Sequence, residues 1–223
     1  MGKVKIWNSR ANDWWDVAHN TRIWNGHNWQ KAKIRGWDGH RWVMLSEERH
    51  VDTWEATWSH GYWSWGSAKP ATSLQPNNYL QSGAYTPFHD FYDVGAGHGM
   101  MGFNDGDIRN KLAGARIEKV ELYVYETHMA YYNKGCTVFG THNARGWQAR
   151  FQESNYDVAR AYWSHRRQDQ WITLPNWVGD NFRDNKLAGI TTNINSKDWY
   201  YYTIIAGTTA GWKKPKLRIT YWK

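Results

Sequence analysis

The chain lacks the features of a disulfide-stapled or membrane-spanning protein. It has one cysteine, Cys136, so no disulfide can form within it, and we expect this thiol to act as a small buried hydrophobic group. No stretch approaches the roughly 20 apolar residues that span a membrane, so we expect no membrane insertion. The first 30 residues hold no apolar core followed by a cleavage site, so we also expect no signal peptide.

The chain also lacks a convincing cofactor or metal motif. The segment GHGMMG at residues 97–102 has the spacing of a dinucleotide-binding loop, but residues 104–106 (NDG) interrupt the helix that should follow it. The spacing of four possible metal ligands in a glycine-rich region matches neither the zinc nor the calcium patterns. These four are His89, Asp90, Asp93 and His98. We therefore expect no metal and no cofactor.

Signs of catalysis are equally scarce. No nucleophile elbow, zinc-protease motif or phosphate-binding loop occurs in the chain. Glycoside cleavage needs two carboxylates facing each other across a sugar. Glu118, Glu121 and Glu126 are candidates only because they lie on or near one predicted strand, and a solvated strand edge explains them better. We predict that the chain is not an enzyme.

Aromatic residues and positive charge are what the chain has in abundance. Its 223 residues fit one medium domain, or one domain with a small appendage, and include 18 Trp and 14 Tyr. These amphipathic rings explain how a mean hydropathy of −0.85 coexists with enough apolar surface for a core. The formal net charge of +8 favours anionic partners such as nucleic acid, acidic membranes or anionic wall polymers, without choosing among them.

A short tryptophan repeat occupies residues 1–46. IWNGHNW at residues 23–29 recurs as GWDGHRW at residues 36–42, and an expanded first copy starts near residue 6 and closes at Trp14. Because Asn-Gly and Asp-Gly favour type I′ turns, each copy predicts a β-hairpin, with Trp24 opposite His27 and Trp29 diagonally across. The rings would pack hairpins together or offer a platform for sugars. They belong to Trp7, Trp14, Trp24, His27, Trp29, Trp37, His40 and Trp42.

The remaining residues, 50–223, predict an antiparallel β-sandwich, jelly-roll-like, after a polar junction at residues 45–49. Val120, Leu122 and Val124 alternate with polar and aromatic residues, which predicts a central strand with one aliphatic and one aromatic face. Further strands are expected around residues 137–139, 171–174, 190–192, 200–205 and 217–221.

Two similar segments, 106–114 and 179–189, predict one or two helical turns each. Apolar residues stand at helical spacing in both, an Asp lies near the start, and a Gly follows the end. We expect these turns to cap the two ends of the sandwich.

Three predicted loops mix flat rings with hydrogen-bond donors. Sugars present C–H faces that stack on rings and hydroxyl groups that pair with Asn, His and Arg, although single-stranded nucleic acid would suit the same groups. The candidate glycan-binding residues are Tyr131, Tyr132, His142, Asn143, Arg145, Trp147, Trp163 and Arg166.

Several segments together resemble the C-terminal region of minor tail proteins from phages of actinobacteria. In the repeats these are KIWN at 5–8, RIWNG at 22–26 and RGWDG at 35–39. In the sandwich they are AGARIEKVELY at 113–123, GTHN at 140–143, WITLP at 171–175, FRD at 182–184 and PKLRITY at 215–221. The resemblance implies a virion tail location, contacts with other virion proteins, a homotrimer and binding to a host envelope polysaccharide. It supplies no catalytic residues.

The sequence therefore predicts a phage tail adhesin that holds a host glycan without catalysis. A virion structural or capsid decoration protein is the first alternative. A wall-polymer depolymerase and the wall-binding module of a lysin follow, and nucleic-acid binding is the weakest of these hypotheses.

Overall fold

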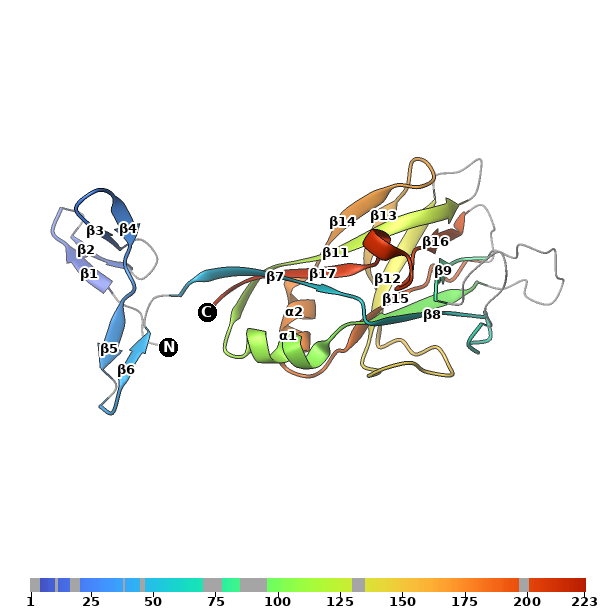
Figure 1. Cartoon of the computed structure of the whole chain (residues 1–223), viewed down its shortest axis with the longest axis horizontal. Coiled ribbons are helices and arrows are strands. Elements are labelled where there is room, and N and C mark those ends of the chain that lie inside the picture. The colour runs from blue at the N-terminus through green and yellow to red at the C-terminus, as the bar shows by residue number, and fades with distance from the viewer. Residues whose placement is uncertain are drawn as a thin grey trace. The chain divides into compact units, whose positions relative to one another are not determined.

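A computed structural model describes residues 5–10, 12–16, 21–37, 39–44, 47–69, 78–84, 96–129, 135–196 and 201–223. The chain divides into two compact units, which Figure 1 shows in colour from blue to red along the sequence. The first unit comprises residues 1–50 with 222–223, and the second comprises residues 51–221. The first carries the hairpins and the second carries the sandwich.

The described part of the first unit forms three separate two-stranded antiparallel sheets. Their strands are β1 (Lys5–Asn8) with β2 (Asp13–Asp16), β3 (Arg22–Trp24) with β4 (Trp29–Lys31), and β5 (Arg35–Trp37) with β6 (Trp42–Met44). In each sheet one Trp faces another across the strands, and Trp7 lies opposite Trp14 in the first.

The predicted register of the repeat hairpins is wrong. Trp24 lies opposite Trp29, not opposite His27, because the loop has four residues instead of two. The Asn25 side-chain oxygen accepts hydrogen bonds from the N–H groups of His27 (2.9 Å) and Asn28 (2.8 Å), which stabilises this longer loop. Gly26 has a φ of 97°, whereas a type I′ turn would need a positive φ at Asn25 as well. His27 is exposed in the loop.

The third hairpin repeats this arrangement, with Trp37 opposite Trp42 and His40 exposed outside the strands. The ring centroids of this pair lie 5.9 Å apart, and those of Trp24 and Trp29 lie 5.7 Å apart. All four rings remain 55–65% exposed. The pairs therefore hold each hairpin closed while leaving large apolar surfaces uncovered within this chain.

The second unit is an antiparallel β-sandwich, which confirms the predicted all-β class. One sheet has the order β13-β12-β15-β10-β8, and the other has the order β7-β17-β11-β16-β9 with β14 also paired to β11. The strands are β7 (Arg49–Glu55), β8 (Trp58–Tyr62), β9 (Leu80–Ser82), β10 (His98–Gly102), β11 (Arg116–Met129), β12 (Cys136–His142), β13 (Asn155–Tyr162), β14 (Asp169–Leu174), β15 (Gly189–Thr192), β16 (Thr203–Ile205) and β17 (Lys216–Trp222).

The long strand β11 has the two faces that its sequence predicts. Val120, Leu122 and Val124 are fully buried in the core between the sheets. Tyr123 and Tyr125 point to the opposite, outer face, because side chains alternate along an extended strand. The alternation of residues along β11 thus determines which side chains enter the core and which lie on the outer face of the sheet.

Two short helices, α1 (Asp105–Leu112) and α2 (Asn176–Arg183), form where helical turns were predicted. Ile108 and Leu112 of α1, and Val178 and Phe182 of α2, are buried as the helical spacing requires. The prediction that the helices cap opposite ends of the sandwich is wrong, because they pack beside each other at the same end (Figure 1).

The GHGMMG segment forms β10, and close packing explains its glycines. A Cβ atom on Gly99 would lie 2.8 Å from the Cβ of Leu80, and one on Gly102 would lie 2.0 Å from Nε1 of Trp58. The free thiol of Cys136 is buried, and this burial raises its pKa, which is consistent with a packing role. Among the described residues, no helix has the length and apolar character needed to cross a membrane.

Candidate functional site

The predicted glycan-binding residues do not form one site. Asn143, Arg145 and Trp147 belong to the loop of residues 143–154, which follows the end of β12, whereas Arg166 belongs to the loop that follows the end of β13. Because Cys136 at the start of β12 pairs with Tyr162 at the end of β13, these two loops lie at opposite ends of the strands. Tyr131 and Tyr132 lie outside the described residues.

Two of the candidates are buried, so the prediction that they contact a glycan is wrong. Trp163 is 0% exposed, and its Nε1–H donates a hydrogen bond to Oγ1 of Thr137 at 2.9 Å. His142 is also 0% exposed, with Nε2 lying 3.0 Å from the carbonyl oxygen of Met101. Burial lowers the pKa of His142 to about 4, so the ring is neutral at physiological pH. Both residues serve the fold.

Arg166 has a structural contact of its own. Its Nε and Nη2 both donate to the carbonyl oxygen of Met129, at 3.0 and 2.8 Å, and the side chain is half-buried. The guanidinium thereby ties the loop after β13 to the end of β11.

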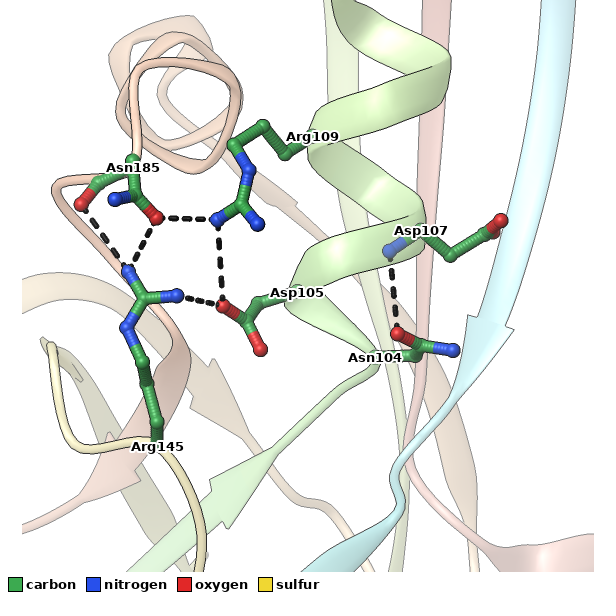
Figure 2. Close-up of polar contacts among 6 residues, drawn as sticks. All are labelled: Asn104, Asp105, Asp107, Arg109, Arg145 and Asn185. Atoms are coloured by element: carbon green, nitrogen blue, oxygen red, sulfur yellow. Dashed lines mark hydrogen bonds and ion pairs between the residues drawn. The ribbon is translucent and has the colours of Figure 1, made fainter.

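Arg145 fastens the 143–154 loop to both helices, as Figure 2 shows. Its guanidinium forms an ion pair with Asp105 at the start of α1 and a hydrogen bond with the side chain of Asn185, just after α2. Nη2 also donates to the Asn185 carbonyl oxygen at 3.3 Å, and Arg109 of α1 contacts the same Asn185 side chain. Asn104 caps α1 by accepting from the N–H of Asp107 at 3.1 Å. We call this set of contacts the arginine clamp.

The rest of the loop lies on the outer face of the β13-β12-β15-β10-β8 sheet. Ala144 and Phe151 pack against Tyr62 and Met100 in a small second hydrophobic cluster. The Tyr62 hydroxyl donates to the carbonyl oxygen of Gln148 at 2.9 Å. The backbone N–H of Phe151 donates to the carbonyl oxygen of Gly66 at 2.8 Å, and that of Ala68 donates to the carbonyl oxygen of Ala149 at 3.1 Å. The loop is therefore held from the sheet, from a neighbouring turn and from the helices.

Trp147 stands on this fastened loop and is 58% exposed. Its ring meets the His60 ring edge to face, with centroids 5.9 Å apart. His60 is buried, its Nε2 lies 3.0 Å from the carbonyl oxygen of Lys69, and burial lowers its pKa. The Trp147 ring thus packs against the His60 ring while more than half of its own surface stays exposed.

A second pair of rings lies near Lys69, whose carbonyl oxygen contacts Nε2 of His60 at 3.0 Å. Nζ of Lys69 lies 4.5 Å from the centroid of the Trp63 ring, and Trp63 stacks on Trp65 with centroids 5.3 Å apart and planes 17° apart. Trp65 is 52% exposed. We call this set the Trp147 surface. It comprises Trp147, His60, Lys69, Trp63 and Trp65.

Sequence reasoning found Trp147 but missed the rest of this surface. The signal was present in WSWGS at residues 63–67, a turn in which Gly66 has a φ of 88° and two Trp stand on either side of one Ser. What the sequence did not show is that this turn bonds to the 143–154 loop, because the two segments are far apart in the chain.

The carboxylates considered for glycoside cleavage do not face one another on β11. Glu121 and Glu126 are five residues apart on an extended strand and so point to opposite faces. Hydrogen bonding to Arg218 and Lys119 lowers the pKa of Glu121. Glu126 is 0% exposed, and burial raises its pKa to about 7. Glu118 lies half-buried nearer the start of the strand.

Among the described residues, no group of three or more His, Cys, Asp or Glu side chains could hold a metal ion. Of the four possible metal ligands in the sequence, His89, Asp90 and Asp93 lie outside the described residues.

Neither a comparison with protein-family models nor one with curated proteins finds a match to this chain. The chemistry of the Trp147 surface therefore has to be judged from its own residues. Open tryptophan rings, here those of Trp147 and Trp65, are groups on which the apolar face of a sugar can stack.

Proposed function

We propose that this chain is a non-catalytic adhesin of a phage virion that holds a cell-surface glycan on the Trp147 surface. The observation that carries the proposal is a large ring kept 58% exposed on a loop that is fastened from three sides. A ring held in place before the ligand arrives loses little conformational freedom on binding. The resemblance of the repeats and sandwich segments to phage tail proteins supports the virion location.

The hairpin unit would serve attachment to the virion or packing between subunits. The rings of Trp24, Trp29, Trp37 and Trp42 are 55–65% exposed. Exposed aromatic surfaces of this kind are typical of regions that another protein covers. In a trimer, three weak glycan sites would reinforce one another through effective concentration, so adhesion would be firm even if each site binds weakly.

The test is binding of the tagged full chain to intact actinobacterial cells, with purified envelope polysaccharides as competitors. We expect saturable binding that a polysaccharide competes away and that Trp147→Ala weakens by about tenfold, the equivalent of about 1.4 kcal/mol. Trp177→Ala is the matched control, because Trp177 is also exposed (38%) but lies on α2, outside the Trp147 surface.

Equal binding by the wild type and Trp147→Ala would refute the proposed site. Failure of the folded chain to bind any host cell, together with binding to virions, would favour the alternative of a structural or decoration protein, for which the exposed hairpin rings would be contact surfaces. Release of new reducing ends from the polysaccharide would favour a depolymerase.

A further inference from the structure

A second aromatic surface lies on the opposite side of the sandwich, on the outer face of the sheet that contains β11. Tyr123 and Tyr125 of β11 project there, and Trp171 of β14 is the direct cross-strand partner of Tyr123. Trp212, on the short 3-10 helix η2 (Gly211–Lys213), meets the Tyr125 ring edge to face with centroids 5.4 Å apart. None of these four rings belongs to the Trp147 surface or to the core between the sheets.

Cations lie over the rings of this surface. Nζ of Lys213 lies 4.4 Å from the centroid of Tyr125, and Nζ of Lys216 lies 5.4 Å from that of Tyr123. The guanidinium carbon of Arg218 lies 3.9 Å from the centroid of Trp171. Three positive charges therefore stand beside three aromatic rings on one face.

The carboxylates nearby do not neutralise all of this charge. Arg218 and Lys119 share Glu121, with contacts of 2.9 and 2.6 Å, and Lys216 lies 3.9 Å from Glu55. Lys213 differs, because its contacts within the described part of the chain are with the rings of Tyr125 and Trp212 and include no carboxylate. An exposed cation–π contact is worth about 0.5–1 kcal/mol, so the ammonium can still donate to an anion.

Trp212 provides the stacking surface beside that ammonium. It is 63% exposed, and Nζ of Lys213 lies 5.6 Å from its ring centroid. The other rings are less accessible, since Trp171 is 38% exposed and both tyrosines are 7% exposed. One open ring beside a cation that contacts no carboxylate in the described ranges suits a sugar that carries an acidic group.

We propose that this face binds an anionic polysaccharide, with a sugar ring on Trp212 and its carboxylate on Lys213. We call it the Trp212 surface. Nucleic acid fits less well, because stacking of successive bases needs several open rings, and here cations already cover Tyr123, Tyr125 and Trp171. The Trp212 surface shares no residue with the Trp147 surface. Loss of ligand binding at one surface therefore implies nothing about binding at the other.

The test is binding of the full chain to polygalacturonate, with dextran as a neutral polymer of similar size. We expect binding to polygalacturonate that weakens as salt rises, since the charges are exposed. We expect Lys213→Met to weaken it by about tenfold or more, the scale of one charge-assisted hydrogen bond. Trp212→Ala should weaken binding to a similar extent. Lys213→Arg keeps the positive charge and should therefore retain most of the wild-type affinity.

Two variants serve as controls for this measurement. Lys186→Met removes an exposed lysine of the same charge that lies beyond α2, 3.9 Å from Asp184, and should leave binding unchanged. Trp147→Ala should also leave polygalacturonate binding unchanged, which separates this site from the proposed function. Three results would overturn the proposal: unaltered binding by Lys213→Met, equal affinity for dextran, or tighter binding of a single-stranded oligonucleotide than of polygalacturonate.

Discussion

Tryptophan plays different parts in the two units of this chain. In the hairpin unit, Trp24 and Trp29 touch each other across the strands and stay 55% and 64% exposed. In the sandwich, Trp163 and Trp54 are 0% and 7% exposed, and each donates its Nε1–H, to Thr137 and to Asp107. A two-stranded hairpin has no second layer to cover its rings, whereas two facing sheets do. Burial of a Trp therefore depends on whether a second layer covers it, and on the outer faces of the sandwich Trp147 and Trp212 stay as exposed as the hairpin rings.

The largest effect on stability is expected for a buried Trp of the sandwich. Trp163→Ala removes a fully buried side chain together with the hydrogen bond from its Nε1–H to Oγ1 of Thr137. Loss of a buried aromatic side chain destabilises a core by about 3–5 kcal/mol. Chemical denaturation followed by far-UV circular dichroism measures the free energy of unfolding of the sandwich. A loss below about 1 kcal/mol would mean that the two kinds of Trp differ less than their burial indicates.

A buried carboxyl group, that of Glu126, gives the sandwich a stability that depends on pH. Glu126 accepts a hydrogen bond from the N–H of Arg167 at 2.9 Å through one oxygen, and the other oxygen is buried with no partner among the described residues. Burial raises its pKa from 4.5 to about 7, so the folded state binds the proton more tightly than the unfolded state. The sandwich should therefore lose stability as pH rises from about 4.5 to about 7, by about 3 kcal/mol in total.

Glu126→Gln tests this directly, because the amide cannot ionise. The difference in unfolding free energy between variant and wild type should grow in favour of the variant between pH 5 and pH 8. This difference has to be measured at each pH, because His142 also changes the unfolding free energy with pH. Burial lowers its pKa to about 4, so its contribution to stability rises with pH over part of the same range. A difference that is constant with pH would show that Glu126 does not titrate there.

The smallest effect is expected in the hairpin unit. Trp24→Ala removes one ring of an exposed pair, and such pairs contribute about 0.5–1.5 kcal/mol. We expect the near-ultraviolet circular dichroism of the ring pair to weaken while the unfolding midpoint of the sandwich stays unchanged. A shifted sandwich midpoint would show that the two units do not unfold independently.

The sequence predicted those parts of the fold that depend on local alternation or spacing. Val120, Leu122 and Val124 identified the buried face of β11, and Ile108 with Leu112 identified a helical turn. The hairpin register was missed because the Asn-Gly pair favours a two-residue turn, whereas the side chain of Asn25 stabilises a four-residue loop. The Trp–Trp contact across the strands then replaces the expected Trp–His contact.

The candidate surfaces were predicted only in part, because they join segments that are distant in sequence. Trp147 was identified from its own loop, but its support by His60 depends on which strand the loop crosses. The sequence does not predict Trp212 as a binding residue, because the Tyr125 ring that supports it is distant in the chain. Trp163 was assigned to a binding loop since nothing near it in sequence indicates that its ring turns inward.

The backbone pairing of Glu48 with Lys223 has a mechanical consequence. Glu48 and Lys223 exchange backbone hydrogen bonds of 2.8 and 3.0 Å, and β7 and β17 continue as neighbours in the sheet from there. A mutual exchange of this kind is the mark of an antiparallel pair. A force that separates residues 48 and 223 would open this ladder one bond at a time. A force that pulls β7 along its own length relative to β17 would instead load all the bonds between the two strands in shear.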